Sequence, residues 1–268
     1  MKQMFLSTGK EFKEIETFEP GAWIHLVNPS QEEALKVAER FNIDIQDLRA
    51  PLDVEETSRI DVEDDYTLIL VDIPTQEERN NKSYYVTIPL GIIVTDEVVV
   101  TTCLENISLM DDFLNHRVRN FYTFMKTRFV FQILYRNAQL YLTALRSIDR
   151  QNDKLEAQLE NSTKNEHLID MMELEKSIVY LKASLKMNER IVKKLTGNAS
   201  SLKKYIEDED LLEDTLVETQ QAIEMAGIYE NVLNAMTETS ASIINNNQNT
   251  IMKTLALMTM ALDIPTVI

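Results

Sequence analysis

Glycine and proline are scarce in this chain, with 5 and 6 residues among 268. Both residue types mark turns and interrupt regular elements, so their scarcity predicts few tight turns and long helices or strands. A single cysteine, Cys103, excludes an internal disulfide framework and a cysteine-based metal cluster. The three histidines lie far apart in the sequence, and none has a partner at the spacing of metal ligands.

Basic residues are also few, because 27 Lys and Arg stand against 44 Asp and Glu, for a formal net charge of -17. Such a surface disfavours nucleic acid, whose phosphates attract Lys and Arg. It suits cations, although an acidic surface that is simply solvated is the more common reason for such a charge. The first six residues lack the apolar segment of a signal peptide.

The familiar motifs of enzyme active sites are missing from the sequence. It contains no glycine-rich phosphate loop, no G-x-S-x-G segment, no cluster of His and Cys, and no arrangement that suggests a catalytic triad. Scattered Asp and Glu are expected at this composition. We therefore predict that the protein is not an enzyme.

Residues 1–120 predict a mixed α/β domain. Ser30 and Glu33 form a capping box at the start of a helix over 31–41, whose inner face carries Ala34, Val37, Ala38 and Phe41. Gly91 lies inside a strand pattern and suggests a bulge. Periodicity predicts strands over 23–27, 59–63, 66–71, 84–94 and 97–102, and further helices over 43–48 and 107–118.

Residues 121–206 predict an antiparallel coiled-coil hairpin. Two runs of residues recur at alternating steps of three and four, which is the spacing of a heptad seam, and a polar turn separates them. The first run is Leu134, Ala138, Tyr141, Leu145, Ile148, Asn152, Leu155 and Leu159, and the second is Met171, Leu174, Ile178, Leu181, Leu185, Asn188, Val192 and Leu195.

Residues 207–250 predict a stalk helix. No proline interrupts the chain between Glu207 and Ile264, and Leu212, Ala226, Leu233 and Ser240 fall on one narrow helical stripe. A helix over 208–264 would be about 85 Å long. A compact domain does not need a helix of that length, whereas a rod that leads to another part of a molecule does.

Residues 251–268 predict the start of a first transmembrane helix that is truncated at Ile268. Thr254 to Ile268 contains one charged residue, Asp263, and no polar cap or glycine closes the apolar pattern. The segment alone is shorter than the roughly 20 apolar residues of a membrane span. The alternative for the segment alone is a helix buried in a core or an oligomer.

Two groups of residues resemble the CorA family of magnesium transporters. The first comprises Asn249-Thr250-Ile251-Met252-Lys253-Thr254-Leu255 and Ile264-Pro265-Thr266-Val267-Ile268, which resemble the start of that family's pore helix. The second lies in the N-terminal half and resembles the family's cytosolic domain, with Trp23-Ile24-His25-Leu26, Pro29, Glu33, Phe41-Asn42-Ile43, Asp47-Leu48, Glu55, Ser58-Arg59 and Ile69-Leu70 in the same order.

The resemblance implies an α+β fold of the funnel type, in which five identical subunits set their long helices around a fivefold axis. It implies a protein of the inner or plasma membrane, anchored by its C-terminal segment, with most of this chain in the cytoplasm. The implied cargo is Mg²⁺, with Co²⁺ and Ni²⁺ as further cargoes, and cytosolic Mg²⁺ bound between subunits closes the pathway.

The resemblance also assigns roles to individual residues. Asp214 matches a sensing carboxylate on the long helix, and Glu77 and Glu78 are the nearest acids for its partner on the neighbouring subunit. Asn249 matches the polar constriction of the pore, and Met252 and Leu255 match its apolar gate. Asp263 departs from the family, which has an apolar residue there, and a carboxylate in a membrane helix needs water or a cation.

Two alternatives stay open at this stage. One is a soluble coiled-coil scaffold protein whose C-terminal helix is buried in an oligomer core. The other is a related zinc transporter, against which the sparse histidines weigh, because Zn²⁺ prefers nitrogen and sulfur ligands while Mg²⁺ takes oxygen.

Overall fold

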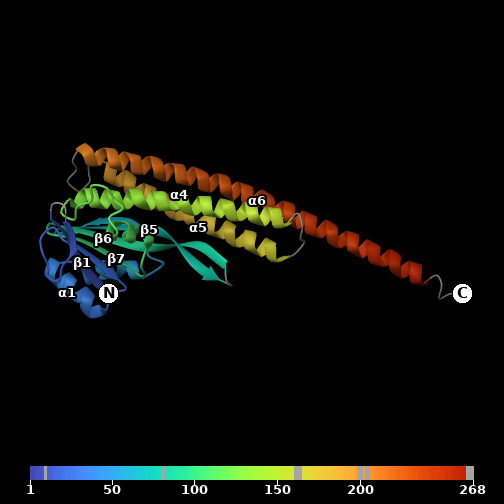
Figure 1. Cartoon of the computed structure of the whole chain (residues 1–268), viewed down its shortest axis with the longest axis horizontal. Coiled ribbons are helices and arrows are strands. Elements are labelled where there is room, and N and C mark those ends of the chain that lie inside the picture. The colour runs from blue at the N-terminus through green and yellow to red at the C-terminus, as the bar shows by residue number, and fades with distance from the viewer. Residues whose placement is uncertain (9–10, 80–81, 160–164, 198–201, 203–205, 264–268) are drawn as a thin grey trace.

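The computed structural model describes residues 1–8, 11–79, 82–159, 165–197, 202 and 206–263. An α/β domain lies at one end, three long helices run alongside it, and the last of these helices continues well past the other two (Figure 1). The predicted fold class is therefore confirmed.

The α/β domain is built on one sheet of seven strands. Their order is β2-β1-β3-β7-β6-β5-β4, and every neighbouring pair is antiparallel except β3 and β7. The strands are β1 (Lys2–Thr8), β2 (Glu11–Glu14), β3 (Trp23–Val27), β4 (Arg59–Val62), β5 (Tyr66–Arg79), β6 (Lys82–Thr95) and β7 (Val99–Cys103).

Strands β1 and β2 were not predicted, because neither shows clear two-residue alternation. Met4, Phe5 and Leu6 of β1 are consecutive and all buried, since β1 pairs with β3 in the interior of the sheet. A run of only three apolar residues is too short a signal to identify a strand.

Helix α1 (Gln31–Phe41) begins and packs as its sequence predicts. Ser30 Oγ accepts a hydrogen bond from Glu33 N at 3.1 Å, and Glu33 Oε2 accepts one from Ser30 N at 2.9 Å. Ala34, Val37, Ala38 and Phe41 are buried. The domain also contains α2 (Ile45–Arg49), the short 3-10 helix η1 (Ala50–Leu52) and α3 (Ser108–Leu114).

The sheet separates two hydrophobic cores. Ile24 and neighbouring residues of its face pack with the inner side of α1, whereas Trp23 and its face pack against α3 and the long helices. Adjacent residues of a strand point to opposite faces, so each strand contributes to both cores.

The bulge predicted at Gly91 is wrong. Pairing continues through this residue without an insertion, because Gly91 lies opposite Leu70 on β5 and Thr102 on β7. A Cβ atom at Gly91 would stand 2.2 Å from Pro51 Cγ of η1. A glycine is needed here because η1 packs closely over the strand. Close approach of another segment is, besides a bulge, a common reason for a glycine within a strand.

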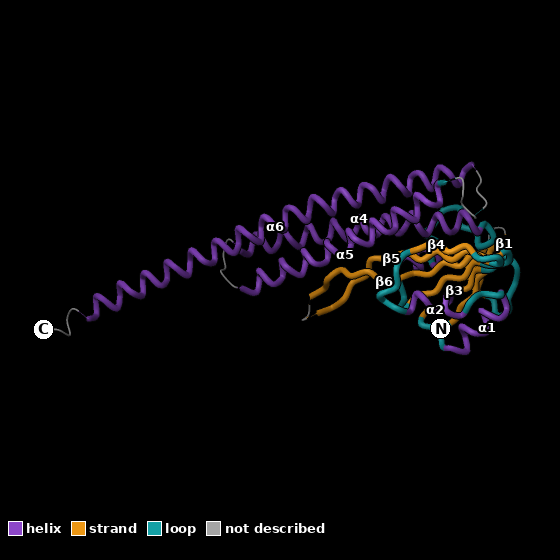
Figure 2. The backbone as a smooth tube through the Cα atoms, turned by 180° about the vertical axis from the view of Figure 1, so that it is seen from behind, coloured by secondary structure: helices purple, strands orange, loops and turns teal. Residues whose placement is uncertain are grey.

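The long helices are α4 (Lys126–Leu159), α5 (Asn165–Thr196) and α6 (Ile206–Asp263). The two predicted heptad runs are buried along almost all of their described length, and Leu155 is half-buried. Helix α6 packs on both other helices, with Met236 beside Asn152 of α4 and Ser240 beside Met171 of α5 (Figure 2). Its seam also contains Thr215, Thr219 and Ala222, which a search for large apolar residues does not find.

Strands β5 and β6 form a hairpin that leaves the sheet. Strand β4 pairs with β5 only as far as Leu70, and β7 pairs with β6 only as far as Leu90. Beyond these residues the hairpin lies along the helices (Figures 1 and 2), where Thr87 Oγ1 is 3.0 Å from Ser184 Oγ and Lys82 Nζ bonds Asp170 at 2.7 Å.

Candidate functional site

Asp72 is the point at which the hairpin is fixed to the helices. Its carbonyl oxygen accepts hydrogen bonds from Asn188 Nδ2 and Asn137 Nδ2, both at 2.8 Å, and from the Tyr141 hydroxyl at 3.1 Å. Its backbone N–H donates to Asn188 Oδ1 at 3.0 Å. Burial raises the pKa of the Asp72 carboxyl, although a hydrogen bond from Ser184 opposes the shift. These bonds replace the sheet neighbour that β5 lacks here.

The predicted sensor residues Glu77 and Glu78 lie on the hairpin beyond this anchor, and both are exposed. Glu77 pairs with Arg79 at 2.5 Å, and that hydrogen bond lowers the pKa of Glu77. Arg79 also reaches Glu173 of α5 at 3.4 Å. The outer end of the hairpin is thereby placed at the level of Glu173.

Asp214 is exposed near the start of α6, far from the hairpin's outer end. Ser240 Oγ lies 3.8 Å from Met171 Sδ, so Ser240 is the part of α6 that is level with Glu173 and the hairpin. Asp214 precedes Ser240 by a helical distance of roughly 40 Å. Within one chain, the structure does not bring Asp214 beside Glu77 or Glu78.

Helix α6 has an exposed face opposite its seam, which we call the free face. Its members recur at alternating steps of four and three, and every one of them is exposed: Asp210, Asp214, Val217, Gln221, Glu224, Ile228, Asn231, Ala235 and Glu238. Sequence reasoning did not pick out this second stripe, although its heptad spacing is legible. Glu238 lies almost level with the hairpin's outer end.

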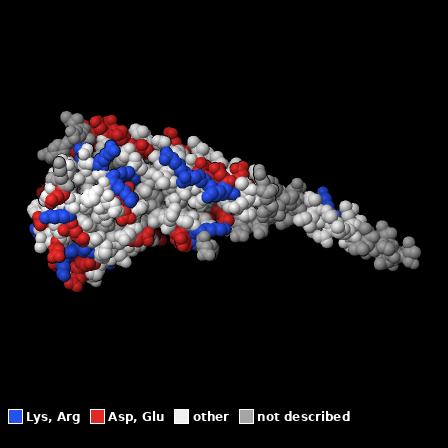
Figure 3. Space-filling model, in the orientation of Figure 1, with Lys and Arg blue, Asp and Glu red and all other residues white. Residues whose placement is uncertain are grey.

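The predicted pore residues lie on the part of α6 that extends beyond α4 and α5 (Figure 1). Asn249 is exposed, and the exposed fractions of Met252 and Leu255 are 69% and 58%. Charged side chains are sparse on this part of the molecule (Figure 3). Asp263 ends α6, but its side chain and residues 264–268 lie outside the described part. Among the described residues, no helix meets the length and hydropathy of a membrane span.

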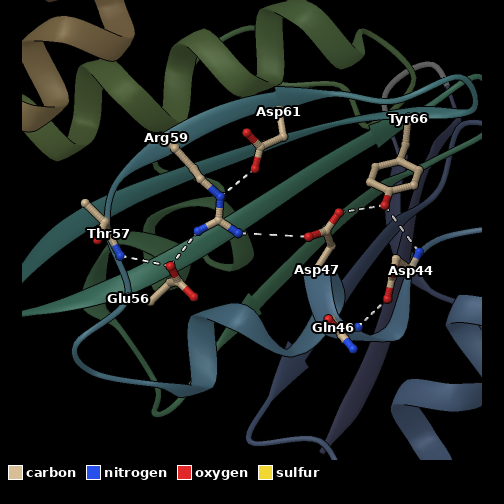
Figure 4. A network of polar contacts seen from close by, with 8 residues as sticks. All are labelled: Asp44, Gln46, Asp47, Glu56, Thr57, Arg59, Asp61 and Tyr66. Atoms are coloured by element: carbon tan, nitrogen blue, oxygen red, sulfur yellow. Dashed lines mark hydrogen bonds and ion pairs between the residues drawn. The ribbon is translucent and has the colours of Figure 1, made fainter.

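A polar network fastens α2 and the following loop to the sheet (Figure 4). Arg59 lies 2.5 Å from both Glu56 and Asp61, and 3.9 Å from Asp47. The Tyr66 hydroxyl donates to Asp47 at 2.7 Å, and burial together with this bond raises the pKa of Tyr66. Because one guanidinium serves three carboxylates, we regard this network as structural.

A ready-made metal centre does not occur within the described residues of a single chain, since no three His, Cys, Asp or Glu side chains converge there. The candidate acids instead stand apart on exposed surfaces. Such an arrangement can bind a cation only when a second molecule contributes ligands, or when the cation keeps much of its hydration shell, as Mg²⁺ readily does.

Comparison with known proteins decides the family. The family described as "CorA-like Mg2+ transporter protein" matches residues 19–268, which include strands β3 to β7 and all three long helices. The chain belongs to the CorA family. This family is one of transporters, not enzymes.

A curated CorA relative is the cobalt/magnesium transport protein CorA of Methanocaldococcus jannaschii, which is 27% identical over 257 residues, or 91% of this chain and 76% of the relative. The complete structure of the CorA magnesium transporter from that organism matches with a TM-score of 0.82 and 23% identity, over 97% of this chain and 82% of the other. The soluble domain of CorA from the same organism matches with a TM-score of 0.79 and 23% identity, over 90% of this chain and 97% of the other.

Proposed function

We propose that this chain is the cytosolic, ion-sensing part of a CorA-type transporter that moves Mg²⁺ across a membrane and closes when cytosolic Mg²⁺ binds between its subunits. The observation that carries the proposal is the family match, which covers all of α6 and extends in sequence to residue 268. The relative that bears cobalt in its name supports Co²⁺ as a second cargo.

The exposed surface of α6 supports assembly into a homo-oligomer, for which we propose five subunits. Beyond the bundle, the large apolar side chains of α6 that the structure describes are uncovered, and those of Ile251, Met252, Leu255, Leu257, Met258 and Met260 are 58–69% exposed. A continuous apolar surface of this kind is costly in water. Other copies of α6 and the lipid of a membrane are the surroundings that would cover it.

Within that assembly, the C-terminal part of α6 would line the pathway. Asn249 offers an amide oxygen to a hydrated cation, which suits Mg²⁺ because this ion prefers oxygen ligands and gives up its water reluctantly. Met252 and Leu255 follow at steps of three, and we assign them to an apolar constriction that closes by excluding water. Asp263 follows Asn249 by two heptads and so belongs to the same helical face. We propose that it also faces the pathway, where its charge meets cations instead of lipid.

The sensing acids belong to two levels of the assembly. We call the position of a residue along α6 its height. Rotation about an axis that runs along α6 leaves this height unchanged, so residues of neighbouring subunits meet at similar heights. Asp214 would therefore meet the sheet end of its neighbour, and Glu77 and Glu78 would meet a neighbour near Glu238. We propose two separate Mg²⁺-binding levels, because roughly 40 Å of helix divides them.

Mg²⁺-dependent resistance to proteolysis tests the sensing role of Asp214. Because a ligand that binds the assembled form stabilises that form by mass action, we expect Mg²⁺ to slow proteolysis of the native chain. Asp214→Ala should raise the Mg²⁺ concentration for half-maximal protection several-fold. Glu213→Ala is the matched control, since Glu213 is an exposed acid next in sequence but off the free face. Equal behaviour of the two variants would remove Asp214 from the sensor.

Transport itself is tested on the natural gene product in liposomes that contain a Mg²⁺-sensitive dye. We expect Mg²⁺ entry down its gradient, and slower entry when Mg²⁺ is also present on the cytosolic face. A flux no greater than that of empty liposomes would contradict the proposed function.

A further inference from the structure

Three cations follow one exposed face of α4 at steps of four residues. Arg146, Arg150 and Lys154 are all exposed, and we call them the basic stripe. Figure 3 shows Lys and Arg side chains in a line over the helices on one face of the molecule. In the part of the chain that the structure describes, no member of the basic stripe has a carboxylate within 4.0 Å.

This arrangement is unusual for a chain with a net charge of -17, in which cations are scarce. Three cations of the long helices, Arg128, Lys182 and Lys193, have carboxylate partners in Asp208, Glu230 and Glu189. Like charges four residues apart on a helix repel each other, and Asp149 and Asp153, three residues after Arg146 and Arg150, offset only part of that repulsion. An anionic surface outside the chain would remove that repulsion.

The free face of α6 carries carboxylates at matching heights. Helices α4 and α6 run in the same direction, because Arg128 is 3.9 Å from Asp208 near their starts and Asn152 is 3.0 Å from Met236 further along. By this correspondence Lys154 is level with Glu238, and Arg146 lies between Glu224 and Glu238, about 8 Å along the axis from Glu224. Both glutamates are exposed.

We propose that the basic stripe of one copy docks against Glu224 and Glu238 on the free face of α6 of the next copy. The contact joins two different surfaces of one chain, and such a head-to-tail contact closes into a ring when the rotation is right. Equal heights are what a rotation about an axis along α6 requires. The inference rests on the homo-oligomer of the proposed function. It adds which charged residues fix the position of one copy along the next.

Two other anionic partners fit the observations less well. Nucleic acid is disfavoured by the overall charge of -17. A membrane surface is disfavoured by position, because the basic stripe runs parallel to α6 and its last member is level with a residue roughly 20 Å before the apolar run at Ile251. That separation exceeds the distance of about 8 Å over which salt screens charges at physiological strength.

Charge reversal tests the contact. In the 268-residue chain, Arg146→Glu with Lys154→Glu should weaken self-association about tenfold, measured by sedimentation at graded concentrations. Adding Glu224→Lys and Glu238→Lys to the same chain should restore association. Lys186→Glu with Arg190→Glu is the control, because it makes the same charge change on the exposed side of α5. Association that is unchanged by the first reversal, or not restored by the second, overturns the inference.

Cross-linking gives a second reading that does not depend on a weakened assembly. The only cysteine, Cys103, is fully buried, so introduced cysteines report cleanly. A mixture of a Lys154→Cys chain and a Glu238→Cys chain should form a disulfide-linked heterodimer, whereas Arg190→Cys mixed with Glu238→Cys should not. A wild-type chain that stays monomeric, or equal cross-linking in both mixtures, overturns the inference. Docking without any Mg²⁺ flux would contradict the proposed function alone.

Discussion

His25 is the residue from which we expect the stability of the fold to depend on pH in the acidic range. It lies on β3 and is 2% exposed, with Nδ1 2.9 Å from Thr101 Oγ1, and that same oxygen accepts a hydrogen bond from Trp23 Nε1 at 2.8 Å. Burial lowers the pKa of His25 from 6.5 to about 4. The imidazole is therefore neutral in the folded chain at pH values where the unfolded chain already binds a proton.

This difference predicts a loss of stability in acid. The unfolded state binds more protons between pH 6.5 and pH 4, so the free energy of unfolding falls as pH decreases through that window, by about 3 kcal/mol in total from this group. Above pH 7 the residue contributes no pH dependence. Urea unfolding between pH 4 and pH 7.5 should show a smaller slope for His25→Gln. The exposed His116, exchanged for Asn, should keep the wild-type slope, and a shared slope in all three proteins would contradict the prediction.

Two glycines predict opposite outcomes for the same substitution. Gly91→Ala should destabilise the protein by about 1–3 kcal/mol, because the new Cβ would stand 2.2 Å from Pro51 Cγ and the proline ring has no rotamer to move into. Gly227→Ala, within α6, should stabilise it by about 0.5–1 kcal/mol, since the nearest atom is Lys182 Nζ at 3.7 Å and alanine favours helix. Thermal unfolding of both variants checks the signs, and a tolerated Gly91→Ala would mean that η1 is not packed as described.

At the scale of elements, two asparagines of the heptad runs show what periodicity does and does not reveal. Each run has an asparagine as its sixth member, Asn152 in the first and Asn188 in the second, and both are buried as the pattern predicts. Asn188 bonds both backbone groups of Asp72 and so holds the hairpin. Asn152 Nδ2 donates to the sulfur of Met236, and its Oδ1 is buried with no hydrogen-bond partner among the described residues. The periodicity predicts that both residues are buried. It does not show which one holds the hairpin and which one lacks hydrogen-bond partners in the helix interface.

The same replacement therefore should separate them. Asn188→Leu should destabilise the protein by about 1–3 kcal/mol, because it leaves the buried N–H of Asp72 without an acceptor. Asn152→Leu should be neutral or stabilising, by up to about 2 kcal/mol, because sulfur is a weak acceptor and an unsatisfied oxygen is removed. Urea unfolding of the two variants measures both effects. Destabilisation of similar size at both positions would show that the hairpin anchor has no special role.

For the whole molecule, the uncovered end of α6 predicts self-association through apolar surface. A chain that ends at Gln248 should scatter far less light at equal concentration than the 268-residue chain, because it lacks the exposed run from Ile251 to Met260. A chain that ends at Asp263 retains the run and should behave like the 268-residue chain. If the shorter chain aggregates equally, the surface responsible lies elsewhere, for instance on the bundle.

Local pattern by itself determined much of this protein. A capping box, a two-residue period and a heptad period depend on residues near one another in sequence, so α1, most strands and the three helices were predictable from residues such as Ser30, Leu134 and Leu174. The family resemblance was readable for the same reason, since its motifs are short segments in a definite order.

Only the tertiary structure decided which distant segments meet. The length of the β5–β6 hairpin depends on Asn188 of α5, which lies more than a hundred residues away from Asp72 and replaces a missing strand. The close approach of Pro51 to Gly91 and the roughly 40 Å between the levels of Asp214 and Glu77 likewise follow from packing. Contacts of this kind depend on how whole elements fit together in space, and no period within a single element encodes them.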